Sequence, residues 1–422
     1  MRVVVRQAAR LSGEIRLPGD KSLSHRLLVF GALSPGTLEI RNVAPGEDAK
    51  ATARCLRSLG AKIETSGEVV RIRGPGELHP PQEVLDCGNS GTTMRLLAGV
   101  LAGAGLPGTL DGDASLRRRP MGRVLEPLRR MGARCEGTRG PDGEERAPLT
   151  FFAGSRLEGG HFRLPMASAQ VKSAILLAGL LAGVPVRVEE PGLSRDHTER
   201  MLGAFAPEGR MPLRLPEAVT VPGDPSSAAF LAAAAALVPG SELRLRGIGA
   251  NPTRIGWIQA LRRMGADLEL VDEGLSVGEP VATLLVRHSP RLRAIRIEGE
   301  EIPSLIDEIP ILAVVATQAE GTTEIRGASE LRVKESDRIA AMAEGLTRMG
   351  AEVEPLPDGL RIQGPTPLRG ARVDAASDHR VAMSLAVAGL RAAGETTIEG
   401  GEWASVSFPD FFRALDTLQA SP

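Results

Sequence analysis

The chain has 422 residues, which suits two domains of about 200 residues each better than a single core. Its formal net charge is -1, so it has no basic surplus that would draw it onto nucleic acid or an anionic membrane. No apolar run reaches the roughly 18 residues that a membrane span needs, and we expect a cytoplasmic protein. The three cysteines, Cys55, Cys87 and Cys135, lie far apart and are predicted to be buried thiols.

A nine-residue phrase recurs along the chain and predicts a helix that ends at a glycine and is followed by a strand. Its copies are LRSLGAKIE at 56–64, LRRMGARCE at 128–136, LRRMGADLE at 261–269 and LTRMGAEVE at 346–354, with a weaker copy, MLGAFAPEG, at 201–209. Upstream of each copy lies a helix made almost entirely of Ala, Leu, Val and Gly, a pattern typical of helices buried on every side. Six such helices begin near Ser22, Ser90, Ser168, Ser226, Asp307 and Asp378.

The spacing of these helices predicts six copies of one unit, namely strand, buried helix, strand, amphipathic helix and a strand pair. The segment VPGDPSSAAFLAAAA at 221–235 echoes LPGDKSLSHRLLVF at 17–30, so both mark the start of a domain. We therefore expect an N-terminal lobe of residues 19–222 and a C-terminal lobe of residues 1–18 plus 223–422. Two crossings of the chain between the lobes favour opening and closing around a cleft.

Short polar patches stand at the starts of four buried helices: GDKSLSHR at 19–26, GNSGTT at 88–93, SAQVKS at 168–173 and SDHR at 377–380. A helix N-terminus carries unpaired N–H groups and partial positive charge, so such starts can bind anions. The alternative is that Ser, Asp and Asn are only N-caps. Recurrence at matching repeat positions, with Lys21, Arg26 and Arg380 added, favours an anion site.

The first patch is not a nucleotide-binding P-loop, because Asp20 stands where that motif needs glycine before the lysine. A second charged group, VKESDR at 333–338, places Lys334 and Arg338 on one face of an expected helix start. Its alternative is a solvated turn with a salt bridge. Asp307 and Glu308 interrupt an apolar run, SLIDEIPILAVV, either as functional carboxylates or as a helix cap. The six histidines are scattered, so no metal site is predicted.

Taken together, LPGDKSLSHR, GNSGTTMRLLAG, RPMG, SAQVKSAILLAGL, KESDRI, DHRVAMSLAVAGL and SFPDFF resemble the enolpyruvyl transferases, specifically their 5-enolpyruvylshikimate-3-phosphate synthase branch. The resemblance implies an α/β fold of two similar lobes, each with three βαβαββ repeats around buried helices, an inside-out α/β barrel. It also implies transfer of the enolpyruvyl group of phosphoenolpyruvate to the 5-hydroxyl of shikimate 3-phosphate, with release of phosphate. This reaction belongs to the shikimate pathway of aromatic amino acid biosynthesis and needs no cofactor or metal.

The same resemblance assigns the site residues. Asp307 is expected to be the base for the hydroxyl and Glu335 the proton donor to carbon, with Lys21 sharing these roles. Shikimate 3-phosphate would be bound by Lys21, Ser22, Arg26, Ser168, Ala169, Gln170, Arg195, Asp307 and Lys334. Phosphoenolpyruvate would be bound by Lys21, Asn89, Gly91, Arg119, Gln170, Arg338, His379 and Arg380.

One departure and two alternatives remain at this point. Many relatives have a lysine where this chain has Val406, so one cation expected near phosphoenolpyruvate is missing. A UDP-N-acetylglucosamine enolpyruvyl transferase should show Lys-Asn in place of Lys21 and Ser22. A non-catalytic sugar-phosphate sensor would need the arginines but neither Asp307 nor Glu335. We expect a monomer whose only partners are the two small substrates, with no nucleic acid or membrane.

Overall fold

A computed structural model describes residues 1–420 and divides into two compact units. The N-terminal unit comprises Gly19–Val221 and Leu275–Glu279. The C-terminal unit comprises Met1–Pro18, Pro222–Gly274 and Pro280–Pro422. The tip of one hairpin, Leu275–Glu279, thus packs with the N-terminal unit although the chain on either side of it belongs to the other unit.

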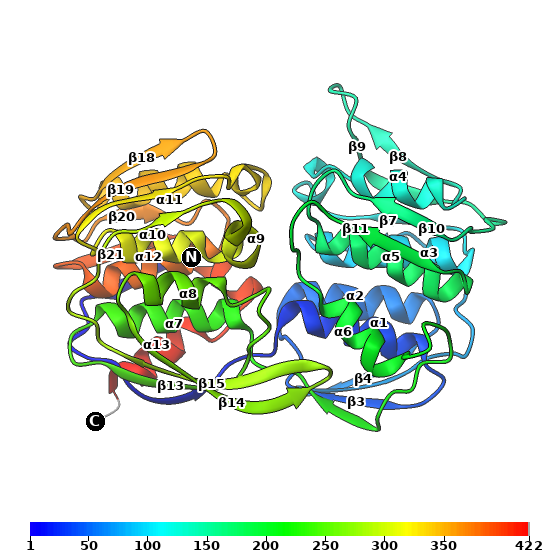
Figure 1. The fold of residues 1–422 in the computed structure, drawn as a ribbon, viewed down its shortest axis with the longest axis horizontal. Helices are drawn as coiled ribbons and strands as arrows, with labels where there is room; N and C mark the ends of the chain where they lie inside the picture. Colours follow the sequence, from blue (N-terminus) through cyan, green and yellow to red (C-terminus); the bar gives the residue numbers. More distant parts are fainter. Residues whose placement is uncertain (421–422) are drawn as a thin grey trace. The chain divides into compact units, whose positions relative to one another are not determined.

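The N-terminal unit contains three sheets, with strand orders β12-β3-β5-β4, β6-β7-β9-β8 and β10-β11. Of its helices (Figure 1), α1, α3 and α5 are largely buried, whereas α2, α4 and α6 bury one face. The elements are α1 (Lys21–Leu33), β3 (Leu38–Arg41), α2 (Glu47–Ser58), β4 (Lys62–Ser66), β5 (Val69–Arg73), β6 (Leu85–Asp86), α3 (Gly91–Ala104), β7 (Gly108–Asp111), the 3-10 helix η1 (Leu116–Arg118), α4 (Gly122–Arg130), β8 (Cys135–Arg139), β9 (Glu145–Phe151), β10 (Gly160–Arg163), α5 (Ala169–Ala182), β11 (Val186–Glu189), α6 (His197–Phe205) and β12 (Ala218–Thr220).

The C-terminal unit also contains three sheets, with strand orders β14-β15-β13-β2, β16-β17-β19-β18 and β1-β21-β20. Its elements are β1 (Arg2–Arg6), β2 (Ser12–Arg16), α7 (Pro225–Leu237), β13 (Glu242–Gly249), α8 (Gly256–Arg263), β14 (Asp267–Ser276), β15 (Glu279–Arg287), β16 (Arg296–Ile297), η2 (Gly299–Glu301), α9 (Ile302–Leu305), η3 (Ile306–Glu308), α10 (Ile309–Ala316), β17 (Gly321–Ile325), η4 (Ser329–Val333), α11 (Arg338–Arg348), β18 (Glu352–Leu356), β19 (Gly359–Gly364), β20 (Arg372–Asp374), α12 (His379–Arg391), β21 (Glu395–Glu399), η5 (Gly401–Val406) and α13 (Phe411–Ala420).

The repeated phrase forms the structure that its glycines predict. Gly60, Gly132, Gly265 and Gly350 follow the ends of α2, α4, α8 and α11, each with φ between 93° and 104°. This left-handed conformation costs glycine little, whereas a side chain would be strained there. A strand begins two or three residues later in every case. The predicted helix ends are confirmed.

The predicted strand pair is wrong for the third and sixth units. Residues 206–217, which follow α6, form no strand, and they contain Pro207, Pro212 and Pro216. Proline cannot donate to a strand ladder, so this stretch is a poor strand. Instead, β12 pairs in parallel with β3 of the first sheet, and β1 from the start of the chain pairs antiparallel with β21. The overall fold class, α/β with repeated buried helices, is confirmed.

Two of the buried helices of the N-terminal unit are in close contact because small residues line the surface between them. A Cβ atom built at Gly99 of α3 would lie 2.3 Å from the carbonyl oxygen of Ala174 on α5, and one at Gly103 would lie 2.7 Å from the Cα of Ala178. These neighbours are backbone atoms and cannot move aside cheaply. The distance between α3 and α5 therefore depends on glycine at both positions.

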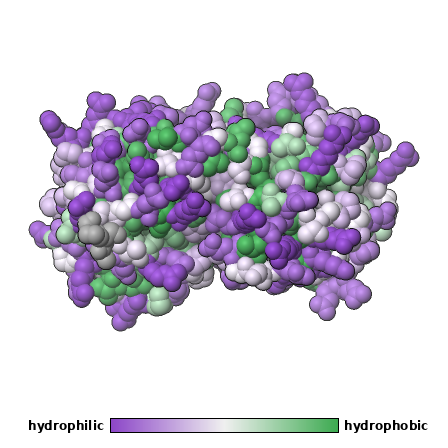
Figure 2. All heavy atoms as spheres, turned by 90° about the horizontal axis from the view of Figure 1, so that it is seen from below, coloured by the Kyte–Doolittle hydropathy of each residue, from purple (hydrophilic) through white to green (hydrophobic). Residues whose placement is uncertain are grey.

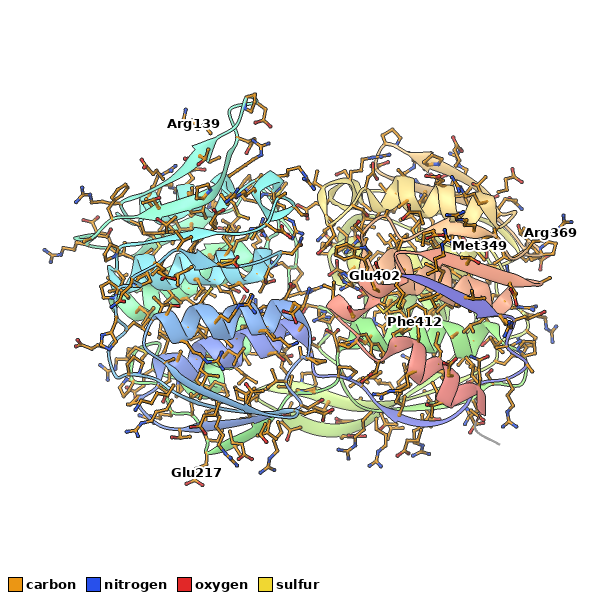
Figure 3. All side chains as sticks on the ribbon, turned by 180° about the vertical axis from the view of Figure 1, so that it is seen from behind. Arg139, Glu217, Met349, Arg369, Glu402 and Phe412 are labelled. Carbon is orange, nitrogen blue, oxygen red and sulfur yellow. The ribbon has the colours of Figure 1, made fainter. Side chains whose placement is uncertain are left out.

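The outer strands and loops carry the charge that the helices lack. Figure 3 shows Arg139 and Glu217 projecting from the N-terminal unit and Arg369 projecting from the C-terminal unit. The face drawn in Figure 2 is mostly hydrophilic, and its hydrophobic residues fall in small separate groups. Within residues 1–420, no helix has both the length and the hydropathy needed to cross a bilayer.

The packing of α3 on α5 predicts opposite effects for two glycine substitutions. Gly99→Ala should lower the free energy of unfolding by about 1–3 kcal/mol, because overpacking outweighs the gain in helix propensity. Gly203→Ala on α6 is the matched control, since its Cβ would meet nothing within 4 Å. That change should raise the free energy of unfolding by about 0.5–1 kcal/mol. Denaturant titration of both variants checks this, and equal effects would contradict the packing argument.

Candidate functional site

The candidate residues of the C-terminal unit gather around Asp307, which lies in η3 just before the apolar helix α10. Its Oδ1 is 3.2 Å from a guanidinium nitrogen of Arg338 and 3.8 Å from the Nζ of Lys334, and its Oδ2 is 3.5 Å from Arg380. Only 13% of the Asp307 side chain is exposed. The N-cap residue of α10 is Glu308, not Asp307, and the Glu308 side chain makes no capping bond.

Arg338 is the buried cation that connects three carboxylates. Its Nε donates to Asp378 at 2.7 Å and its Nη2 donates to Glu335 at 2.6 Å, in addition to the contact with Asp307. Its side chain is 1% exposed. Burial alone would lower the pKa of Arg338, but the negative charges of Asp378, Glu335 and Asp307 outweigh burial and raise the pKa above its ordinary value. This guanidinium therefore stays protonated.

The sequence predicted that Lys334 and Arg338 share one face of a helix, and this prediction is wrong. Lys334 ends the 3-10 helix η4, and α11 begins only at Arg338, with Asp337 as its N-cap. The two cations nevertheless approach the same carboxylate oxygen, Oδ1 of Asp307. The turn between the two helices, and not a helical face, brings them together.

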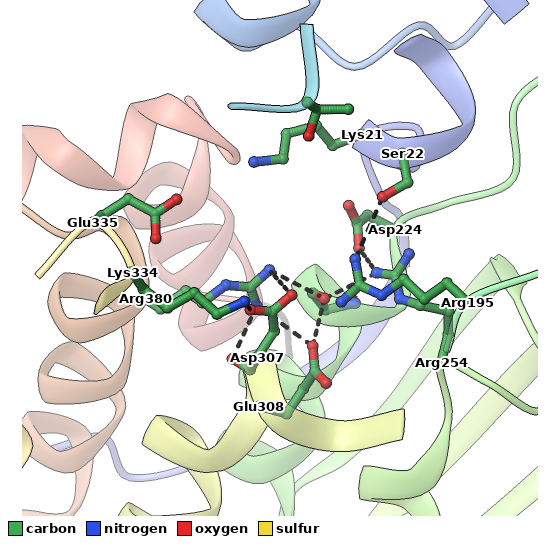
Figure 4. Close-up of polar contacts among 12 residues, drawn as sticks. Lys21, Ser22, Arg195, Asp224, Arg254, Asp307, Glu308, Lys334, Glu335 and Arg380 are labelled. Carbon is green, nitrogen blue, oxygen red and sulfur yellow. Dashed lines mark hydrogen bonds and ion pairs between the residues drawn. The ribbon is translucent and has the colours of Figure 1, made fainter. Parts of the chain in front are cut away.

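Arg380 is held by groups at the starts of three helices (Figure 4). Its Nη1 donates to the backbone oxygen of Asp307 at 3.1 Å and to Glu308 at 3.4 Å. Its Nη2 donates to the hydroxyl of Ser226, at the start of α7, at 3.4 Å. The Ser226 hydroxyl donates in turn to buried Glu308 and accepts from Arg254. Arg380 is therefore fixed by a buried polar network and only 8% of its side chain is exposed.

The start of α12 combines a cap with two candidate residues. Asp378 accepts a hydrogen bond from the backbone N–H of Arg380 at 2.8 Å, so it is a true N-cap. It also pairs with Arg338, which lowers the pKa of Asp378 against the opposing effect of burial. His379, the first residue of α12, is buried beside them. One aspartate thus caps the helix and anchors the central cation.

In the N-terminal unit, the start of α1 carries Lys21, Ser22 and Arg26. Asp20 caps this helix by accepting from the N–H of Leu23 at 2.9 Å, which explains why an acidic residue precedes the lysine. Lys21 pairs with Asp48 of α2 at 3.0 Å. Ser22 accepts from Arg195 at 3.4 Å (Figure 4).

Arg26 is 3% exposed and its guanidinium donates to three protein groups, the Thr198 hydroxyl, the Ser22 carbonyl and the Ser173 hydroxyl. Burial lowers the pKa of Arg26 to about 10. The structure shows Arg26 supporting Ser22, and its direct contact with a substrate stays a prediction.

The start of α3 brings Asn89, Gly91 and Arg119 together. Arg119 donates to the Oδ1 of Asn89 at 2.5 Å. A Cβ at Gly91 would lie 2.8 Å from Arg95 and 3.4 Å from Arg119, so glycine lets two arginines approach the backbone. The sequence analysis missed Arg95, which donates to the Oε1 of Gln170 at 2.6 Å. Its signal was a single charge inside an otherwise apolar helix, four residues after Gly91.

The start of α5 carries Ser168, Ala169 and Gln170. Gln170 donates to the hydroxyl of Thr92 at 2.9 Å, which ties it to the start of α3. Ser168 is the N-cap residue of α5, but its side chain makes no capping bond. It differs in this from Ser90, whose hydroxyl accepts from the N–H of Thr93. The N-cap alternative therefore holds for Ser90 and fails for Ser168.

The sequence-predicted residues thus form two clusters. The N-terminal cluster consists of Lys21, Ser22, Arg26, Asn89, Gly91, Arg119, Ser168, Ala169, Gln170 and Arg195. The C-terminal cluster consists of Asp307, Lys334, Glu335, Arg338, His379 and Arg380. In the part of the chain that the structure describes, no group of three or more His, Cys, Asp or Glu side chains could hold a metal ion.

The fold matches that of the enolpyruvyl transferase NikO from Streptomyces tendae with a TM-score of 0.74 at 20% identity. That match covers 100% of this chain and 98% of the other, and it bears on the fold alone. The chain belongs to the EPSP synthase (3-phosphoshikimate 1-carboxyvinyltransferase) family, whose profile matches residues 5–415.

Individual relatives support this membership. The 3-phosphoshikimate 1-carboxyvinyltransferases of Synechococcus strains JA-3-3Ab and RCC307 are 53% and 54% identical, each match covering 97% of this chain and 95% and 98% of the relatives. The solved EPSP synthase of Acinetobacter baumannii is 41% identical with a TM-score of 0.86, covering 99% of this chain and 98% of that one.

A buried histidine beside the N-terminal cluster predicts a pH dependence of stability. His25 of α1 is fully buried and its Nδ1 lies 2.6 Å from the Thr52 hydroxyl, which continues to Thr93 at 2.7 Å. Burial lowers the pKa of His25 from 6.5 to about 3. The folded protein therefore keeps His25 neutral, whereas the unfolded chain binds a proton there below pH 6.5.

We expect the free energy of unfolding to fall by up to about 1.4 kcal/mol per pH unit as the pH drops below 6.5. His25→Gln should remove this part of the slope. Melting temperatures between about pH 7.5 and 5 check it, with the exposed His161→Gln as the control. If the melting temperatures of the wild type and His25→Gln changed in parallel with pH, the assignment would be contradicted.

Proposed function

We propose that the chain transfers the enolpyruvyl group of phosphoenolpyruvate to the 5-hydroxyl of shikimate 3-phosphate and releases phosphate. Family membership over residues 5–415 supports this activity. Among the contacts, the observation that carries the proposal is the convergence of Asp307 and Glu335 on the buried cation Arg338. Two carboxylates beside several fixed cations suit an acid-base reaction between anionic substrates.

The reaction needs two proton transfers, one to the methylene carbon of phosphoenolpyruvate and one from the 5-hydroxyl of the acceptor. Protonation of the methylene carbon of phosphoenolpyruvate leaves a cation-like C2, which the 5-hydroxyl attacks as it loses its own proton. The resulting tetrahedral ketal then loses phosphate and returns the methyl proton to the protein, which restores the double bond. We assign Asp307 as the base for the hydroxyl and Glu335 as the donor to carbon. Positioned proton transfers of this kind typically contribute about 10² to 10⁴ in rate.

The contact of Glu335 with Arg338, at 2.6 Å, bears on its role as a donor. A neighbouring cation favours the ionised carboxylate, whereas a donor must carry a proton. The phosphate and carboxylate of bound phosphoenolpyruvate bring negative charge to the same cations and offset this effect. Lys21 shares the proton transfers in this scheme.

The N-terminal cluster would supply most of the shikimate 3-phosphate contacts. Lys21, Ser22, Ser168, Gln170 and Arg195 contribute hydroxyl, amide and cationic groups at the starts of α1 and α5 and before α6. Charge-assisted hydrogen bonds of this kind suit a phosphate group. Asn89, Gly91 and Arg119 would meet phosphoenolpyruvate together with Arg338, His379 and Arg380.

We place this activity in the cytoplasm and propose a monomer. The three cysteines are unpaired and buried, which fits a reducing compartment. The net charge of -1 supports small-molecule partners over nucleic acid or membrane lipid.

A direct assay tests the activity. The purified chain should release phosphate from phosphoenolpyruvate when shikimate 3-phosphate is present, and mass spectrometry should find the enolpyruvyl ether. UDP-N-acetylglucosamine serves as the second acceptor in the same assay. Turnover of the nucleotide sugar alone would overturn the proposal, and tight binding without turnover of either acceptor would indicate a sensor.

The carboxylate pair gives a sharper prediction. Glu335→Gln should lower kcat at least ~10²-fold because it removes the proposed proton donor, while shikimate 3-phosphate still binds. Kinetics and calorimetric titration measure the two quantities. Glu344→Gln on the adjoining helix α11 is the control, since Glu344 is 64% exposed and pairs on the surface with Arg348. Equal turnover in the two variants would remove Glu335 from the mechanism.

A further inference from the structure

A buried carboxylate that no step above uses lies next to the N-terminal cluster. Glu190 directly follows β11, and only 7% of its side chain is exposed. It accepts three donors: the backbone N–H of Ser168 at 2.6 Å, the hydroxyl of Ser194 at 2.7 Å and the ammonium of Lys172 at 2.8 Å. A carboxylate with this number of partners is fixed in position.

Lys172 balances this charge inside the unit. It lies on the second turn of α5, is 10% exposed, and also contacts Glu199 of α6 at 2.7 Å. Burial alone would lower the pKa of Lys172, but the hydrogen bonds that its ammonium donates to Glu190 and Glu199 more than compensate and raise the pKa overall. Buried ions of this kind are costly unless they are paired and fully hydrogen-bonded, so the pair is an expensive feature for structure alone.

The partners of Glu190 are the two segments that the N-terminal cluster depends on. Ser168 is the N-cap residue of α5. Its backbone N–H donates to Glu190, while the Ser168 hydroxyl makes no capping bond. Ser194 immediately precedes Arg195, whose guanidinium reaches the Ser22 hydroxyl. A single carboxylate therefore links the start of α5, the loop before α6 and, through Arg195, the start of α1.

The negative charge of Glu190 also matters for the binding of an anionic substrate. An uncompensated carboxylate beside a phosphate-binding site would repel the substrate. Lys172 offsets part of that repulsion, although the same ammonium also pairs with Glu199. Lysine is also unusual in this chain, which uses arginine almost everywhere. A compact ammonium with three donors can contact two carboxylates in a confined space where a planar guanidinium fits less well.

We propose that Glu190, paired with Lys172, is a positioning residue that sets the affinity for shikimate 3-phosphate by holding Ser168 and the Ser194–Arg195 loop in place. Glu190 itself does not touch the substrate. The proposal rests on the proposed function for the identity of the ligand, and it assigns to these buried residues a role in specificity.

The test compares two adjacent glutamates. Glu190→Gln keeps the shape but loses the charge and one acceptor. We expect KM for shikimate 3-phosphate to rise roughly 10-fold, with kcat and KM for phosphoenolpyruvate within about twofold of wild type. The control is Glu189→Gln, because Glu189 is 51% exposed and pairs on the surface with Arg163 and His161. Its kinetic constants should match those of the wild type.

Two further variants keep the test decisive. Ser194→Ala removes one donor without burying an unpaired charge, and it should raise the same KM even where Glu190→Gln fails to fold. Lys172→Met leaves the charge of Glu190 uncompensated. This single variant should therefore bind shikimate 3-phosphate more weakly than the double variant Lys172→Met/Glu190→Gln does.

The outcomes separate the two proposals. A wild-type chain that does not turn over shikimate 3-phosphate would defeat the proposed function. An active wild type with the same shikimate 3-phosphate KM in Glu190→Gln, Ser194→Ala and Glu189→Gln would defeat the positioning role. A parallel shift of kcat and both KM values in Glu190→Gln and Ser194→Ala would indicate a merely structural role and would overturn it as well.

Discussion

Helices that are buried along most of their length have room for polar groups chiefly near their ends, and Lys21, Asp307 and Arg380 stand at or just before the starts of such helices. All thirteen residues of α7 are buried, and α1, α3, α5 and α12 are nearly as enclosed. Side chains at the starts of α1, α3, α7 and α12 accept hydrogen bonds from the first N–H groups, and Lys21 and Arg380 stand at two of these starts.

Buried charge then has to be balanced locally. Arg338 is surrounded by Asp307, Glu335 and Asp378, and Lys172 by Glu190 and Glu199. The first group holds the two carboxylates proposed to exchange protons with substrates, and in the second group Lys172 and Glu190 are buried. In the proposed reaction, an anionic substrate at the C-terminal cluster would compete with its carboxylates for the cations. Binding and proton transfer would then be coupled through the same ion pairs.

The repeats made much of the fold predictable from the sequence. Glycines that need positive φ mark the helix ends, and the absence of polar residues marks the buried helices. The third unit escaped prediction because Pro207, Pro212 and Pro216 replace a strand pair by an irregular segment. The pairing of β1 with β21 also escaped, since nothing local in a strand identifies a partner almost 400 residues away.

The candidate site was predictable where residue type and position agreed, as for Asp307, Lys334, Arg338 and Arg380. The analysis misjudged how Lys334 and Arg338 come together, because a turn between two short helices leaves no periodic signal. It passed over Glu190, which looks like any charged residue at a strand end. Its burial depends on Lys172, eighteen residues earlier, and on Ser168 and Ser194, contacts that only the folded chain reveals.

Comparison of equivalent helix starts in the two units shows how one repeat acquired different tasks. Asp20 and Asp224 both cap their helices, so the structural part of the motif is retained in α1 and α7. Two positions after these caps, Ser22 contacts Arg195, whereas Ser226 is enclosed by Glu308, Arg254 and Arg380. The residue between is Lys21 in one unit and Pro225 in the other. A cap stabilises the start of a helix whatever its task, but a lysine is not needed for that purpose, so the departure at Lys21 is the part of the motif that the proposed function would use.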